Sequence, residues 1–140
     1  MSFFKIGIYE YNANILINNM SYHGFAVIEN IYDINQKVIG QNVTKRYMYK
    51  SKEVLAIHSF LHNSFYNYSN TRNSARSGSY VICGEQIIIN AEGFSGILGF
   101  FCKRKIIIKK SENALQTYYH YLDNDNNYIL YLVGEYRFIH

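Results

Sequence analysis

The chain has 140 residues, a formal net charge of +4 at pH 7, and 49% hydrophobic against 17% charged residues. This composition is typical of a globular protein, excludes a disordered chain, and at this length predicts a single domain over residues 1–140. The longest nearly uncharged apolar stretch, residues 93–102, is far shorter than the ~20 residues that a membrane-spanning helix needs. We therefore expect no membrane partner.

Two cysteines, Cys83 and Cys102, each lie within an apolar run. Free cysteines in such runs behave as small hydrophobic residues, so we expect both thiols to be reduced and buried. No secretory signal pattern is visible at the start of the chain. Together these features predict a cytoplasmic location.

The N-terminal part of the sequence has the pattern of β-strands. Apolar and polar residues alternate over 3–11, a short partner strand follows at 15–17, and further strands are expected at 25–34 and 43–49. Turn-forming Asn and Gly residues separate these runs.

One amphipathic helix is predicted over residues 51–68. Ser51 is a suitable N-cap, and Glu53 favours the positive end of a helix. Apolar residues then recur at intervals of three and four: Val54, Ile57, Leu61, Phe65 and Tyr68. This stripe is expected to pack against a sheet.

Residues 69–79, SNTRNSARSGS, form the most loop-like segment of the chain and carry two arginines. Beyond it, short apolar runs alternate with turn signals. The turns predicted there are Gly84-Glu85, residues 91–96, Lys103-Arg104-Lys105, residues 123–127 and Gly134-Glu135.

These elements predict an α+β, β-rich fold. Short strands with tight turns and no alternation of strand and helix favour an antiparallel sheet over a parallel one. We expect this sheet to be strongly curved, as a half-barrel or sandwich, and packed by the helix at about 51–68. Unpaired sheet edges at 3–11 or 128–133 would permit a homodimer.

Catalytic and metal-binding signatures are weak. His58 and His62 would share one helix face, but the glutamate of a zinc-protease motif is missing between them. The acidic run 123–127 lacks the glycine and glutamate of a calcium loop. No nucleophile motif is present. We therefore predict no catalytic residue, no metal and no cofactor.

Basic side chains gather in two blocks and in the loop-like segment, where they could contact an anion or an acidic partner. The candidate binding residues are Arg46, Arg72, Arg76, Lys103, Arg104, Lys105, Lys109 and Lys110.

Three functions stay open. The leading one is a small non-enzymatic protein that neutralises a specific protein partner with an acidic face, as an immunity protein or a phage-type inhibitor does; tyrosine and arginine are enriched at such interfaces. The second is a binder of nucleic acid or of a phosphorylated ligand. The third is a small metal-independent ribonuclease or toxin that uses histidines.

Overall fold

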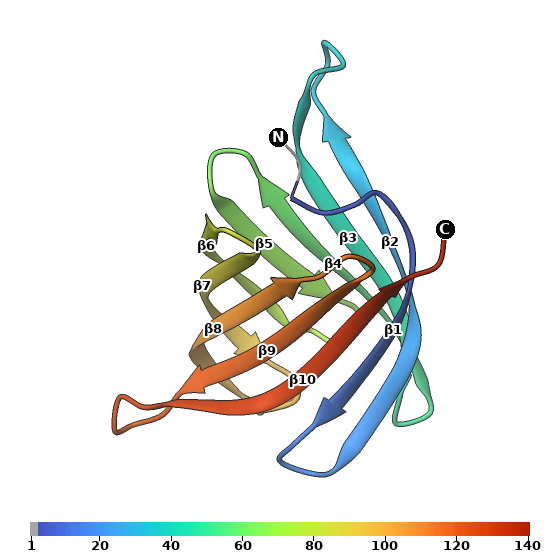
Figure 1. Cartoon of the computed structure of the whole chain (residues 1–140). Coiled ribbons are helices and arrows are strands. Elements are labelled where there is room, and N and C mark those ends of the chain that lie inside the picture. The colour runs from blue at the N-terminus through green and yellow to red at the C-terminus, as the bar shows by residue number, and fades with distance from the viewer. Residues whose placement is uncertain (1–2) are drawn as a thin grey trace.

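A computed structural model describes residues 3–140, which form ten antiparallel β-strands arranged as a closed barrel (Figure 1). The strands are β1 Gly7–Ile15, β2 Met20–Tyr32, β3 Val38–Tyr49, β4 Lys52–Leu61, β5 Phe65–Asn70, β6 Ala75–Cys83, β7 Gln86–Ser95, β8 Phe100–Lys110, β9 Ala114–Leu122 and β10 Tyr128–Phe138. No helix in residues 3–140 is long and apolar enough to cross a membrane.

Each strand pairs with the strands before and after it in the chain, and β1 pairs with β10 to close the ring. The closing ladder runs from Tyr9 opposite Phe138 to Ile15 opposite Leu132. The expectation of a half-barrel or sandwich is therefore wrong, because closure leaves no sheet edge among the ten strands. The predicted homodimer required a free edge at β1 or β10, but these two strands pair with each other.

The predicted helix at 51–68 is also wrong, and the predicted α+β class with it. Residues 52–61 form β4, residues 62–64 turn, and β5 follows. Val54, Ala56, His58 and Phe60 alternate into the barrel, whereas Ile57 of the supposed stripe is exposed. The spacing of three and four residues arose from apolar residues on both faces of two short strands.

Two of these five predicted turns are confirmed and three are wrong. Gly84, with φ of 62°, and Glu85 connect β6 to β7, and residues 123–127 connect β9 to β10. Residues 91–95 instead lie within β7, residues 103–105 within β8 and residues 134–135 within β10. The turn before β8 is at 96–99, and most of the loop-like segment 69–79 belongs to β5 and β6.

Alternation along every strand sends one set of side chains into the barrel and the other set outward. The interior has two regions. Near one end it is apolar, with Phe4, Val43, Phe60, Ile89 and Ile108 around a small void of about 10 Å³. Toward the other end it is rich in tyrosine and in buried cations.

The N-terminal segment closes the apolar end of the barrel. Phe4 is buried with its ring 5.0 Å from that of Phe60, in an edge-on contact. The side chain of Gln41 accepts a hydrogen bond from the backbone N–H of Phe4 and donates one to its carbonyl. Lys110 Nζ donates to the carbonyl of Phe3. The segment is thus tied to β3 and β8.

Candidate functional site

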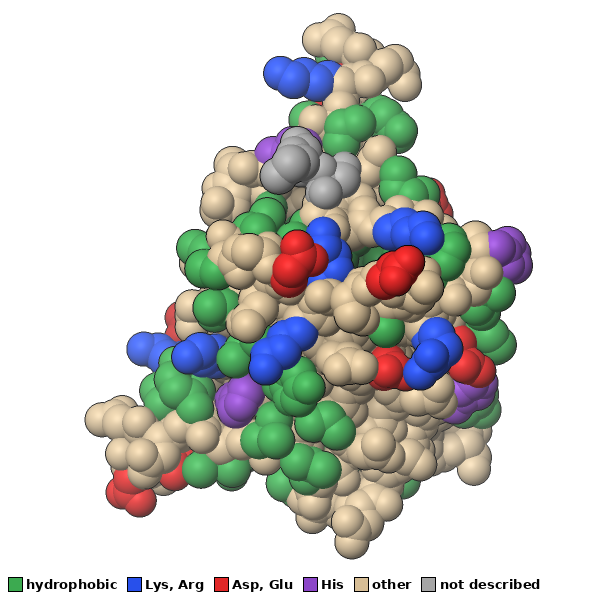
Figure 2. Space-filling view, in the orientation of Figure 1, with side chains coloured by type: hydrophobic (Ala, Val, Ile, Leu, Met, Phe, Trp, Pro, Cys, Tyr) green, Lys and Arg blue, Asp and Glu red, His purple; other side chains and the backbone are tan. Residues whose placement is uncertain are grey.

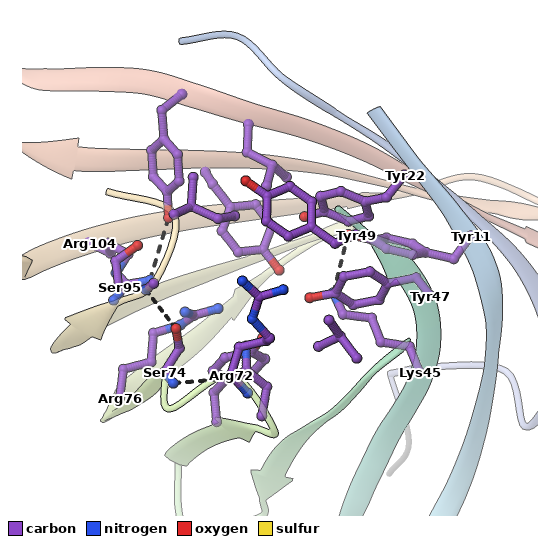
Figure 3. Close-up of a pocket in the computed structure, with 18 residues that line it drawn as sticks. Tyr11, Tyr22, Lys45, Tyr47, Tyr49, Arg72, Ser74, Arg76, Ser95 and Arg104 are labelled. Atoms are coloured by element: carbon purple, nitrogen blue, oxygen red, sulfur yellow. Dashed lines mark hydrogen bonds between the residues drawn. The ribbon is translucent and has the colours of Figure 1, made fainter. Parts of the chain in front are cut away.

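The tyrosine-rich end of the barrel contains a cavity of about 140 Å³ (Figure 3). Its walls come from β1 to β10, and its mouth is formed by the turns before β6 and before β8, where Arg72, Ser74, Gly96 and Ile97 lie. In an up-and-down barrel, alternate turns lie at alternate ends, so this mouth is opposite the end that the N-terminal segment closes.

Two arginines, Arg76 on β6 and Arg104 on β8, point into the cavity from neighbouring positions. Both flank Gly93 of β7, since Arg76 pairs with Gly93 and Arg104 Nη2 donates to the Gly93 carbonyl at 3.2 Å. The side chains are almost completely buried, with exposed fractions of 6% and 2%. The cavity therefore contains two fixed positive charges, because arginine stays protonated in proteins.

Neither guanidinium is neutralised by an acid. No Asp or Glu among residues 3–140 is buried, and the ion pairs of this part of the chain, formed by His23, Arg46 and Arg137, lie on the surface. Arg76 stacks on the ring of Tyr68 at 3.8 Å from its centroid. The Nε atoms of Arg76 and Arg104 are buried without a hydrogen-bond partner.

A bulge in β10 contributes to the Arg104 environment. The register of β10 against β9 shifts between Leu130 and Leu132, so that Tyr131 and Leu132 are both buried although they are adjacent. Arg104 Nη1 lies 3.5 Å from the Tyr131 hydroxyl. Bulges commonly redirect side chains in this way near binding sites.

Lys45 on β3 supplies a third buried amine, deeper in the barrel. Its Nζ donates to the hydroxyls of Tyr11 and Tyr136 at 3.2 and 3.1 Å. Burial, reinforced by the charge of Arg76, lowers the pKa of Lys45 well below its ordinary value. Burial therefore disfavours the charged form of this amine, and the permanent charges of the cavity are those of the arginines.

Tyrosine rings form the wall that faces the arginines (Figure 3). Tyr22 and Tyr47 stack with centroids 4.4 Å apart, and Tyr49 meets Tyr22 edge-on at 5.8 Å. Burial raises the pKa of Tyr22 and of Tyr47 above the ordinary value, so both hydroxyls are neutral at physiological pH. This wall offers aromatic faces and neutral hydroxyl groups.

The mouth is ordered by hydrogen bonds between two turns. The Asn70 side chain accepts from the backbone N–H groups of Arg72 and Ser74, and Ser74 Oγ accepts from the N–H of Gly96. The Arg72 guanidinium lies 5.4 Å from the centroid of the Tyr49 ring, and its Nη1 is buried without a partner. A third arginine therefore stands at the entrance.

The structure brings together three of the predicted binding residues, Arg72, Arg76 and Arg104. The others lie elsewhere: Lys103 and Lys109 are exposed on the outer face of β8, and Lys105 lies partly exposed there. Lys110 binds the N-terminal segment. Arg46 is exposed and pairs with Glu53 at 3.6 Å. Figure 2 shows basic and acidic side chains interspersed on the face that it draws, rather than a continuous basic surface.

Sequence reasoning missed Lys45 as a residue of the interior. The signal was available in VTKRYMY, where alternation places Val43, Lys45 and Tyr47 on one face of a strand. A lysine on the same face as buried apolar residues is unusual, and it indicates either an outward face or a polar interior.

The histidine pair proposed for a helix face is separated in the structure. His58 is buried inside the barrel, with Nδ1 2.8 Å from the Tyr66 hydroxyl, whereas His62 is exposed in the turn after β4. Burial and the charges of Lys45 and Arg76 lower the pKa of His58. Residues 3–140 contain no cluster of three His, Cys, Asp or Glu side chains that could hold a metal ion.

Comparison with known proteins gives no match: no family model, no curated protein and no solved structure is significantly similar to the chain.

Proposed function

We propose that this protein binds a small anionic molecule inside the barrel, at Arg76 and Arg104. One observation carries the proposal: two guanidinium groups are buried at the cavity with unpartnered Nε atoms, and no carboxylate of residues 3–140 is buried with them. Of the three functions predicted from the sequence, this is the second, a binder of a phosphorylated ligand. The proposed site lies inside the barrel instead of on its surface.

Buried charge without a counter-ion is costly, by several kcal/mol for each ion even after the protein relaxes. An anion in the cavity offsets that cost through charge-assisted hydrogen bonds, which are roughly twice as strong as neutral ones. Arginine suits this role because its planar fork matches the oxygens of carboxylate and phosphate groups. A barrel of this type is also a common container for a single small ligand.

Neutralisation of a protein partner, as an immunity protein or inhibitor, stays a prediction. It would use the outer face of β8, where Lys103, Lys105 and Lys109 could meet an acidic partner. The cavity supports the small-ligand function more directly. A cytoplasmic location is proposed with it, since Cys83 and Cys102 are both free; Cys102 is buried as predicted, but Cys83 is exposed.

The proposal is tested by thermal unfolding and calorimetric titration with inorganic phosphate. A ligand that binds only the folded state at 100 times its Kd adds about 2.7 kcal/mol of stability. Phosphate should therefore raise the melting temperature, whereas chloride at the same ionic strength should not. The shift should vanish in Arg76→Met and persist in Arg46→Met, a control on the outside of β3. Equal shifts in the two variants, or none with phosphate, would contradict the proposal.

A further inference from the structure

We infer that the ligand is a phosphate monoester of an aromatic or heteroaromatic ring. This inference rests on the proposed function and assigns the chemical class of the ligand. It follows from the placement of the arginines and of three tyrosines on opposite sides of the cavity, from the number of fixed charges, and from the size of the space.

The two walls come from opposite sides of the barrel. Arg76 and Arg104 stand on β6 and β8, and Tyr22, Tyr47 and Tyr49 stand on β2 and β3 (Figure 3). A ligand between them contacts guanidinium groups on one side and the stacked pair of Tyr22 and Tyr47 on the other, and Tyr68, Tyr119 and Tyr131 also line the space. Stacking on aromatic side chains is favourable for any planar ring. The geometry thus fits a molecule with an anionic end and a planar end.

The number of charges favours a phosphate monoester over a carboxylate. Arg76 and Arg104 contribute two permanent charges without a buried acid, and Arg72 adds a third at the mouth. A carboxylate carries one negative charge, whereas a phosphate monoester carries between 1.5 and 2 at about pH 7 and has three acceptor oxygens. The dianion therefore balances the two buried arginines and provides an acceptor for each free Nε–H.

The size of the space limits the ring. At about 140 Å³, the cavity is close to an engineered apolar cavity of about 150 Å³ that accommodates benzene. The space therefore matches a single ring or a single phosphate group, and the rest of the ligand must extend into the mouth past Arg72. The opposite end is closed by Phe4 and Gln41, so a polymer cannot thread through the barrel. A nucleic-acid strand is therefore a poorer fit than a single small ester.

The test compares phenyl phosphate, inorganic phosphate and phenol by isothermal titration calorimetry against the full chain. Phenyl phosphate should bind about tenfold more tightly than inorganic phosphate, because stacking adds to the charge contacts. Phenol should bind much more weakly than either. Tyr47→Leu should remove the tenfold advantage and leave the affinity for inorganic phosphate within about threefold of the parent. Tyr47→Phe, which keeps the ring, should retain it, and Tyr128→Leu on the outer face of β10 is the matched control.

The outcomes separate the two proposals. Equal affinity for phenyl phosphate and inorganic phosphate overturns the assignment of an aryl ester and leaves anion binding intact. Binding of phenol as tight as that of phenyl phosphate removes the role of the arginines. If no phosphate compound binds, both proposals are wrong. Because phenyl phosphate and inorganic phosphate are compared on the parent chain, a folding defect in Tyr47→Leu does not prevent a decision.

Discussion

At the scale of single residues, the buried arginines are expected to lower the stability of the barrel. Arg76 is buried against Tyr68 and lacks an acidic partner, so it contributes desolvation cost without an ion pair. Replacement of buried ionic groups by apolar ones of similar volume is often neutral or stabilising by 1–4 kcal/mol. A residue that costs stability in the empty protein is expected to serve a ligand.

Arg76→Met should therefore be at least as stable as the parent in anion-free buffer, by up to ~1–4 kcal/mol in the free energy of unfolding. Urea titration monitored by tyrosine fluorescence measures this difference. The exposed Arg46→Met should change stability by less than ~0.5 kcal/mol. A large loss of stability in Arg76→Met would show that the guanidinium is structural.

Lys45 makes the stability of the barrel depend on pH. Burial, then the charge of Arg76, lowers its pKa in the folded state below the 10.5 of an exposed lysine. Between these two pKa values the unfolded chain holds a proton on Lys45 that the folded chain lacks. Stability therefore rises with pH in this window, by about 1.4 kcal/mol per pH unit at full effect.

Lys45→Met should remove this slope. The free energy of unfolding, measured in urea as the pH is raised from neutral to about 9.5, should rise more steeply in the parent and in Lys103→Met than in Lys45→Met, over whatever part of this range lies above the lowered pKa. The range stops there because buried tyrosines such as Tyr11 have pKa values raised above 10.0, which reverses the sign at higher pH. Parallel pH profiles for the parent and Lys45→Met would show that Lys45 is charged in the folded barrel.

At the scale of elements, the close approach of β6 and β7 at Gly93 positions the two arginines. A Cβ atom on Gly93 would lie 2.0 Å from the Ala75 carbonyl oxygen and 2.6 Å from the Arg76 Cα. Only glycine allows the two backbones to be this close, so the site depends on a residue that has no side chain.

Gly93→Ala should cost about 1–3 kcal/mol or more, because the strands must separate. It should also weaken phosphate binding, since Arg76 moves with β6. Gly99→Ala is the comparison: its φ of 82° imposes strain of about 1 kcal/mol, but no atom lies within 4 Å of the added Cβ. Chemical denaturation and phosphate titration of both variants provide the measurement. Equal effects on stability and on phosphate binding would contradict the role assigned to the close approach.

The N-terminal segment is a second element with a defined contribution. Phe4, 3% exposed, fills the apolar end and should cost about 3–5 kcal/mol when changed to Ala. Phe65→Ala, at a position 42% exposed on β5, should cost far less. Similar losses in the two variants would mean that Phe4 does not close the barrel.

The sequence predicted antiparallel strands in both the N-terminal and C-terminal parts, and the turns at Gly84-Glu85 and at 123–127, because alternation and clusters of turn-forming residues are local signals. The predicted helix at 51–68 is wrong because the inward positions of β4 include His58 and Ala56. These two residues weaken the alternation of large apolar and polar side chains that indicates a strand. The predicted turn at 103–105 is wrong for a related reason. Arg104 faces the polar interior, so three consecutive basic residues in the middle of β8 have the composition of a turn. A polar interior thus hides the strand pattern at the positions that form the site.

At the scale of the whole molecule, closure of the ring could not be predicted from sequence. It depends on β1 meeting β10 across nearly the full length of the chain, a pairing that carries no local signal. The site has the same origin, since Lys45, Arg76 and Arg104 come from three strands that only the ring places around one space. The sequence identifies the basic residues as candidates for binding. It does not show which of them face the interior of the barrel and which face the outside.

The segment at Phe3 and Phe4 that closes one end of the barrel has a kinetic consequence. In residues 3–140 the cavity opens at the turns near Arg72 and Tyr49, and Phe4 packs at the opposite end. A ligand bound as proposed would therefore enter and leave at the Arg72 end, and the barrel would retain and release it without passing it through. The dissociation rate of a bound ligand should depend on the residues at this mouth. Substitutions at Arg72 should therefore alter that rate more than substitutions at Phe4 do.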